Sequence, residues 1–249
     1  MNLITLNSVD STNSFAQQLL ANDSAPDLTV ILAIEQTAGK GQRGNVWESC
    51  ANQGLYCSII FKPADLPVSN QFLFNKAVAV AVASFISNRL GKVVHIKWPN
   101  DILVEGKKIA GLLIENSLRG DRISAIICGV GINLNQISFD HSFNTPATSL
   151  RLELGGDFNP AEEVKSLFRF VNNEYQQFLM KEEERINAAY HRILYGLNVQ
   201  HTFMREGAIF TAELIEVRND GSAVLLHNGF PIVAHHPLVR FCANVKSSR

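Results

Sequence analysis

The sequence predicts an α+β fold: a mixed, largely antiparallel sheet with helices, followed by a small C-terminal β-barrel. Four strand-like segments joined by hairpin-length connections run from 93 to 133, which indicates antiparallel pairing. Apolar residues recur at helical spacing over 71–90. After Gly196, short β-type runs alternate with glycine-containing turns. We therefore expect two domains, 1–195 and 196–249.

Composition excludes several classes of protein. Of the 249 residues, 46% are hydrophobic and 18% charged, which is typical of a globular chain and excludes disorder. Twenty-two basic and 23 acidic residues leave no basic excess for nucleic acid. The longest apolar stretch, 77–86, is too short to span a membrane, and the N-terminus lacks signal-peptide features. We expect a cytoplasmic protein that binds neither nucleic acid nor membranes.

Cysteine and histidine spacing indicates no metal or redox centre. The four cysteines form no CxxC pair and the seven histidines no HExxH motif, so a zinc site is not suggested. We interpret the cysteines as buried free thiols.

Short apolar runs, and the polar and turn residues between them, predict the secondary structure of the first half. Ser11, Thr12 and Asn13 are typical helix caps and precede an amphipathic stretch with Phe15 and Leu19. Strands are expected at 3–6, 30–34, 55–61, 93–97, 102–104, 109–115 and 123–133. The segment 36–54 is rich in Gly, Gln, Asn and Ser, which predicts a long loop that is either functional or disordered.

The second half is predicted to be two helices and then β-strands. Asn159 before Pro160, with Glu162 in the first turn, marks the start of one helix, and another is expected at about 182–194. The strands of the barrel are expected at 199–205, 209–217, 223–227, 231–234 and 239–241.

Residues 39–44 read Gly-Lys-Gly-Gln-Arg-Gly, a literal GxGxxG motif. A dinucleotide-binding fold requires a helix to open there, and 45–54 has no helical apolar period, so we exclude that fold. A flexible backbone with Lys40 and Arg43 suits an anionic phosphate. The alternative is an ordinary mobile surface loop.

A second motif is Lys-Trp-Pro-Asn-Asp at 97–101, with Lys108 seven residues beyond Asp101. A hairpin at 105–107 would bring a carboxylate, an amide and up to three amines to one rim. These ammonium groups could neutralise a carboxylate and a triphosphate that approach each other, and Asp101 could hold magnesium. The alternative is a simple turn followed by solvated charge.

A third motif, Gly-Val-Gly-Ile-Asn at 129–133, ends a predicted strand. Alternate glycines permit close approach of another group, and Asn133 offers a donor and an acceptor to an adenine edge. The alternative is a β-bulge.

In order and spacing, the motifs together resemble the biotin protein ligases, and the resemblance covers essentially the whole chain. Lys-Trp-Pro-Asn-Asp followed shortly by Lys-Lys-x-Ala-Gly is specific to that family. The matching segments are 10–13, 35–47, 97–101, 107–111 and 129–134. The resemblance implies a class II synthetase-like catalytic domain and an SH3-like C-terminal domain. Because the first motif begins at Asp10, we expect the form without an N-terminal DNA-binding domain.

The resemblance also implies an activity: ATP-dependent attachment of biotin to a lysine of a biotin carrier domain, such as that of acetyl-CoA carboxylase, through biotinyl-5'-AMP. Mg²⁺ would accompany ATP. The implied catalytic residues are Lys108, Arg43 and Lys97, and Asp101 is the candidate metal ligand. The implied biotin-binding residues are Ser11, Thr12, Asn13, Gln36, Gly39, Lys40, Gly41, Gln42, Lys108 and Gly111; those for ATP are Arg43, Trp47, Asn100 and Asn133.

One position departs from the family pattern. The family motif commonly reads GRGRxG, and here Lys40 and Gln42 replace two arginines. Gln42 lacks the charge, which puts a phosphate contact in doubt. A lipoate ligase or octanoyl transferase, a biotin-sensing repressor and a catalytically weak biotin-binding module are the rival interpretations. The sequence leaves the acceptor protein open, and also the choice between monomer and homodimer.

Overall fold

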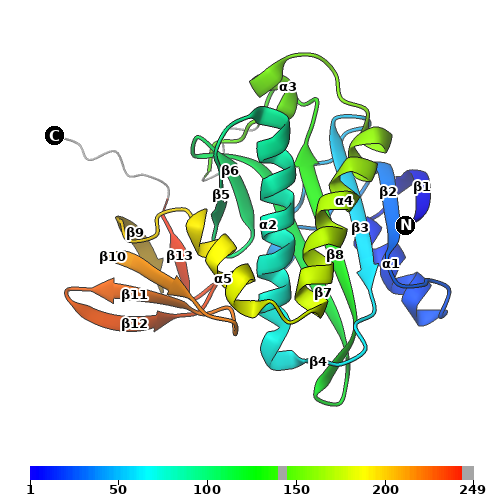
Figure 1. Ribbon diagram of the computed structural model, residues 1–249. Helices are drawn as coiled ribbons and strands as arrows, with labels where there is room; N and C mark the ends of the chain where they lie inside the picture. Colours follow the sequence, from blue (N-terminus) through cyan, green and yellow to red (C-terminus); the bar gives the residue numbers. More distant parts are fainter. Residues whose placement is uncertain (140–144, 243–249) are drawn as a thin grey trace.

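The computed structural model describes residues 1–139 and 145–242. It has a large eight-stranded sheet with helices packed on it and a separate five-stranded sheet (Figure 1). The predicted α+β class with a mixed sheet is therefore confirmed.

The large sheet is antiparallel except at one edge. Its strands, in spatial order, are β1 (Asn2–Val9), β2 (Thr29–Gln36), β3 (Gly54–Phe61), β8 (Arg122–Asn133), β7 (Lys107–Arg119), β6 (Asp101–Val104) and β5 (Val94–Lys97), and β4 (Leu66–Pro67) pairs with β8. β1 and β2 are parallel and are connected through α1 (Thr12–Ala21). The consecutive strands β5 to β8 pair as antiparallel neighbours, as the hairpin-length connections predicted.

The predicted long helix, α2 (Gln71–Leu90), is buried on almost every side. It ends at Gly91, which has a φ of 63° that favours glycine. Asn159 caps α4 (Pro160–Leu179), since its Oδ1 accepts the N–H of Ala161 at 3.0 Å. α5 (Glu183–Arg192) follows. The sequence did not predict β4, α3 (Leu150–Leu154) or two 3-10 turns, Gln42–Gly44 and Val68–Asn70.

The two faces of the sheet are covered unequally. Because side chains alternate along a strand, Val30 and Leu32 join the core under α2 and α4, whereas Ile31 and Ile60 pack with α1 on the opposite face. In Figure 1, α2 and α4 lie across one face of the sheet. The short α1 covers only part of the other face, which leaves room there for a pocket.

The small domain, residues 200–241, is one antiparallel sheet in the order β12-β11-β10-β9-β13. Its strands are β9 (Gln200–Arg205), β10 (Ala208–Val217), β11 (Ala223–His227), β12 (Phe230–Ala234) and β13 (Val239–Phe241). A small C-terminal β domain was predicted, but the barrel is not closed by hydrogen bonds in the described residues. β13 has three residues, and they pair with β9 and not with β12 at the other end of the sheet.

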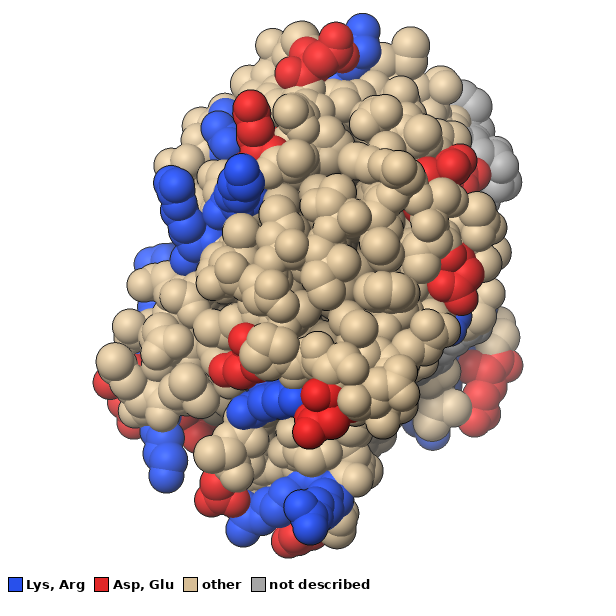
Figure 2. Space-filling view, turned by 90° about the vertical axis from the view of Figure 1, so that its right-hand side faces the viewer, with Lys and Arg blue, Asp and Glu red and all other residues tan. Residues whose placement is uncertain are grey.

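Figure 2 shows the side of the molecule where β1 and α1 lie. Acidic and basic side chains are scattered over this side, and a broad middle part carries neither. In the described residues, no helix is long and apolar enough to cross a membrane.

Candidate active site

A pocket of about 670 Å³ lies on the face of the large sheet that α1 only partly covers. Of the residues predicted from the sequence, those that line it are Ser11, Thr12, Asn13, Gln36, Lys40, Gly41, Gln42, Trp47, Lys97, Asn100, Asp101, Lys108 and Gly111. Asn133 lines an adjoining pocket of about 280 Å³. The structure therefore brings the dispersed motifs together. The side chain of Arg43 lies outside the described residues.

Backbone hydrogen bonds close the glycine-rich segment 39–47 into a loop. Trp47 N–H donates to Gly39 O at 2.9 Å, and Gly41 N–H donates to Asn45 O at 2.7 Å. Gly39 has no space for a Cβ atom, which would overlap the Trp47 carbonyl. Only a 3-10 turn forms at Gln42–Gly44, so the helix that a dinucleotide-binding fold requires does not open at this motif.

One end of the pocket, which we call the α1 end, is lined by Ser11, Thr12, Asn13 and Gln36, with the buried Ser58 behind them. Thr12 donates its N–H and its hydroxyl to Gln36 Oε1, at 2.8 and 3.1 Å. The buried Ser58 hydroxyl lies 2.7 Å from Thr12 Oγ1 and 2.5 Å from Asn13 Oδ1. Ser11 occupies the N-cap position of α1, but its side chain makes no capping hydrogen bond. The predicted helix start is therefore confirmed, although the cap residue stabilises it without a side-chain hydrogen bond.

Asn13 is held in one orientation. Its Nδ2 donates to Leu113 O at 3.3 Å and to Glu115 Oε2 at 2.6 Å, while its Oδ1 faces Ser58. A Cβ atom on Gly129 would lie 2.5 Å from Asn13 Oδ1. Sequence reasoning missed Ser58 and Glu115; the serine inside an otherwise apolar strand was the available signal.

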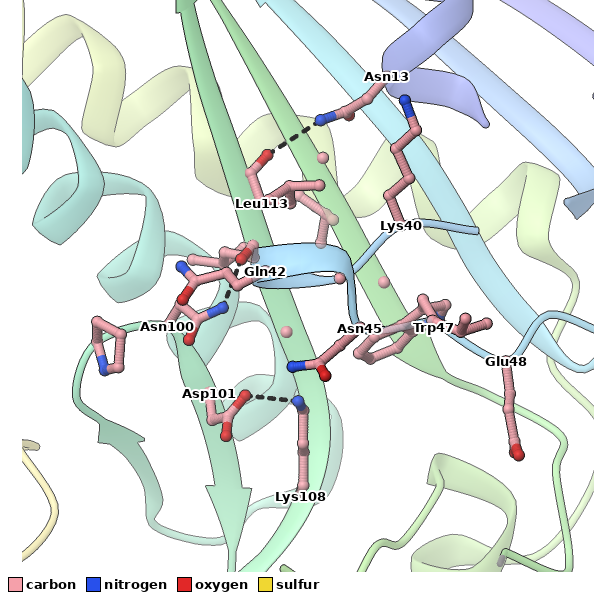
Figure 3. A pocket seen from close by; sticks show the side chains of 18 of the residues that line it. Asn13, Lys40, Gln42, Asn45, Trp47, Glu48, Asn100, Asp101, Lys108 and Leu113 are labelled. Carbon is pink, nitrogen blue, oxygen red and sulfur yellow. Dashed lines mark hydrogen bonds and ion pairs between the residues drawn. The ribbon is translucent and has the colours of Figure 1, made fainter. Parts of the chain in front are cut away.

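The opposite end, which we call the lysine end, consists of Lys97, Asp101 and Lys108. Figure 3 shows Asp101 and Lys108 there. Lys108 Nζ lies 2.6 Å from Asp101 Oδ1, and Lys97 Nζ donates to Thr145 Oγ1 at 3.0 Å. Burial holds the pKa of Lys97 below its usual value; Lys108 acts in the same direction and Asp101 opposes it. Two ammonium groups and one carboxylate leave a net positive charge for an anionic ligand.

The two hairpin lysines have different surroundings. Lys107 is half exposed, does not line the pocket, and lies 3.8 Å from a carboxylate oxygen of Glu153. Lys108 is the one that reaches the pocket, where the resemblance implied a catalytic lysine.

The Trp47 indole ring packs on Gly111 and Gly131, two motif glycines on the neighbouring strands β7 and β8. A Cβ atom on Gly131 would lie 2.5 Å from the indole ring, and one on Gly111 would lie 2.9 Å from it. Gly129 and Gly131 pair in register with both neighbouring strands, so the β-bulge alternative is wrong. The buried Trp47 Nε1 has no hydrogen-bond partner among the described residues.

The two asparagines expected to read adenine also hold the backbone around the pockets. Asn100 Nδ2 donates to Leu112 O at 2.7 Å, and Asn133 Nδ2 donates to Thr148 O at 2.9 Å. Each asparagine therefore fixes a segment of the pocket walls in addition to any contact with a ligand.

The candidate metal ligands and the cysteines were also located in the structure. In the part of the chain that the structure describes, no group of three His, Cys, Asp or Glu residues is placed to hold a metal ion. Cys57 and Cys128 are buried free thiols, as predicted, and burial raises the pKa of both, that of Cys128 to about 12. Cys50 is exposed, contrary to expectation, and Cys242 is partly exposed.

The small domain also contributes to the pocket, which the sequence did not reveal. His236, Pro237, Arg240 and Phe241 line it next to Lys97 and Trp98. The His236 and Trp98 rings meet edge to face with centroids 5.4 Å apart. Residues on either side of the domain boundary therefore form a single pocket.

The model of the biotin/lipoate A/B protein ligase family matches residues 5–133. The bifunctional ligase/repressor BirA of Bacillus spizizenii is 36% identical over 71% of this chain, which spans about half (54%) of that relative's length. The biotin–[acetyl-CoA-carboxylase] ligase of Paracoccus denitrificans is 33% identical over 61% of this chain and 64% of its own length. A solved structure of the biotin protein ligase from Aquifex aeolicus, in complex with biotin and ATP, has a TM-score of 0.80 at 24% identity, covering 96% of this chain and 99% of that one.

Proposed function

Since this chain belongs to the biotin/lipoate A/B protein ligase family, we propose that it attaches biotin to a lysine of a carrier protein at the expense of ATP. The observation that carries the proposal is the single pocket with two chemically different ends. The hydrogen-bonded α1 end suits the neutral ureido head of biotin. The lysine end suits the biotin carboxylate and the phosphates of ATP.

In the first step, the biotin carboxylate attacks the α-phosphorus of ATP, which gives biotinyl-5'-AMP and pyrophosphate. Both reactants are anions, so the protein must hold them together and offset their repulsion. Lys108 and Lys97 supply positive charge from fixed positions, and we assign Arg43 to the same task from its place in the sequence. No covalent enzyme intermediate is required.

Magnesium enters as part of the substrate MgATP. Mg²⁺ commonly binds one or two protein carboxylates together with phosphate oxygens. Asp101 fits that role through the oxygen that is not paired with Lys108, and the phosphates would supply most of the ligands. Trp47, Asn100 and Asn133 would bind the adenosine part.

In the second step, the amine of the carrier lysine attacks the carbonyl carbon of biotinyl-5'-AMP, and AMP leaves as the amide forms. The segment 39–47, with Gly39, Lys40, Gly41 and Gln42, would cover the mixed anhydride and shield it from water. The partner would be the biotin carrier domain of a carboxylase, and the reaction would occur in the cytoplasm.

The test is to incubate the protein with ATP, labelled biotin and a biotin carrier domain, and to measure labelled carrier and pyrophosphate. We expect both products, and neither without ATP. Lipoate and octanoate in place of biotin test the other branch of the family. Transfer of either acid with no transfer of biotin would show that biotin is not the substrate. Biotin binding without pyrophosphate release would show a binding module instead of an enzyme.

A further inference from the structure

Lys76, on α2, is a buried charge outside both pockets. The residue is 1% exposed. Its Nζ donates to Val217 O at 2.6 Å, to Asn187 Oδ1 at 2.7 Å and to Asn219 Oδ1 at 3.0 Å. An ammonium group has three donors, and all three are used here. Burial lowers the pKa of Lys76 to about 8, so the side chain is still mostly charged at pH 7.

Two of these acceptors belong to the small domain or the turn that follows its strand β10. Val217 is the last residue of β10, and its own N–H donates to His191 Nε2 on α5 at 3.1 Å. His191 Nδ1 lies 2.8 Å from Asn187 O and donates to it, which leaves Nε2 as an acceptor. Side chains of the large domain therefore bind both backbone polar groups of Val217.

The same turn leads to the pocket. Gly221 O accepts the indole N–H of Trp98 at 3.0 Å. A Cβ atom on Gly221 would lie 2.8 Å from the Phe72 ring of α2, so the turn lies tightly against the large domain. Trp98 in turn contacts His236, which lines the pocket with Arg240. The turn 217–222 thus connects Lys76 to the part of the pocket wall that the small domain supplies.

We infer that Lys76 is a positioning residue, which fixes the small domain on the large one so that His236 and Arg240 complete the lysine end of the pocket. A buried ammonium is costly unless its donors are satisfied, and two of its acceptors, Val217 O and Asn219 Oδ1, are in place only when the small domain is docked. The small domain therefore docks at the same time as the Lys76 ammonium gains its hydrogen-bond partners. The inference rests on the proposed function for its kinetic readout.

The test compares Lys76→Met with Arg89→Met in the full-length protein. Arg89 lies on the same helix and pairs with Glu163 of α4 at 3.0 Å, so its loss removes a charge without touching the small domain. We expect at least tenfold faster amide hydrogen exchange in β10 and β11 of Lys76→Met, with unchanged exchange in β3 and β8. The KM for ATP should rise about tenfold while the KM for biotin changes much less, because the α1 end, where the head of biotin is proposed to bind, contains no small-domain residue. Arg89→Met should show neither change.

Asn219→Ala, which removes one acceptor, provides a milder variant if Lys76→Met does not fold. It should show the same pattern with a smaller effect. Unchanged exchange in the small domain, or an equal rise of both KM values, would overturn the inference. The exchange measurement needs no activity, so a protein without ligase activity would overturn the proposed function and leave the role of Lys76 to be judged from exchange alone.

Discussion

The two ends of the pocket differ in the chemistry of the side chains that form them. At the α1 end, Thr12, Asn13, Gln36 and Ser58 come from a helix and two neighbouring strands, and their polar atoms are bound to one another. At the lysine end, Lys97 and Lys108 flank the turn and hairpin around Asp101. Figure 3 shows Asn13 near one end and the Lys108–Asp101 pair near the other.

Under the proposed function, this difference separates recognition from catalysis. A network of mutually bound neutral groups has a fixed shape and a fixed order of donors and acceptors, so it suits a ligand part that does not change in the reaction. Charged side chains held in place by their partners suit the part where bonds break and negative charge is redistributed. Changes at the α1 end should therefore alter the KM for biotin, and changes at the lysine end should alter adenylate formation.

The largest effect is expected for Lys108→Ala. The variant removes the charge that, in the proposed reaction, faces both reacting anions, and it leaves Asp101 without its partner. Adenylate formation should fall by about 10²–10³-fold, the scale seen when one group that stabilises a transition state is removed. Pyrophosphate release measures it. Lys107→Ala is the matched control and should reduce adenylate formation much less, because Lys107 lies beside Glu153 and not in the pocket. Equal losses in the two variants would contradict the assignment.

The next effect is expected for Asn13→Asp, which probes the α1 end. The change replaces the Nδ2 donor by an oxygen that faces the Glu115 carboxylate, at a position now 2.6 Å away. A carboxylate that has no donor and is repelled by Glu115 should weaken biotin binding by about 2–3 kcal/mol, which corresponds to a roughly 100-fold rise in the KM for biotin. The double variant with Glu115→Gln should recover part of that loss, because the new amide can donate to Asp. No recovery would show that Glu115 does not orient Asn13. Isothermal titration with biotin separates this from any effect on ATP.

A smaller effect is expected from pH, and only at the lysine end. Burial lowers the pKa of Lys97, so its proton is lost at a lower pH than that of an exposed lysine, and its attraction for the triphosphate fades earlier as pH rises. The KM for ATP should therefore rise several-fold with increasing pH over a range that begins below the one in which an exposed lysine titrates, whereas the KM for biotin should change less. Lys97→Arg keeps its charge throughout this range and should remove the rise. An alkaline limb that persists unchanged in Lys97→Arg would assign the titration to another group.

How far the sequence predicted this molecule depends on the range of the interactions. The helix α2 and the antiparallel strands β5 to β8 follow from local periodicity and short connections. The pocket residues of the motifs were found because a resemblance ties their spacing to one site. Ser58, Glu115 and Lys76 were missed because their roles depend on partners 45, 102 and 141 residues away in the chain. The pocket wall from the small domain was missed for the same reason, since docking leaves no local pattern.

The smallest effect is expected at Gln42, where the chain departs from the arginine common in its family. Gln42 lines the pocket from the glycine-rich segment, and a neutral amide there forms weaker hydrogen bonds to phosphate than a guanidinium would. Gln42→Arg should slow the loss of biotinyl-5'-AMP by about three- to tenfold, and Gln42→Glu should speed it, while Gln42→Met controls for side-chain length. The off-rate of labelled adenylate after rapid dilution measures the effect. Because Gln42 is not part of the α1 end, the KM for biotin should change less than the adenylate off-rate. Off-rates that do not differ between Gln42→Arg and Gln42→Glu would show that backbone amides and lysines alone hold the phosphate, and that the missing arginine has no consequence in this chain.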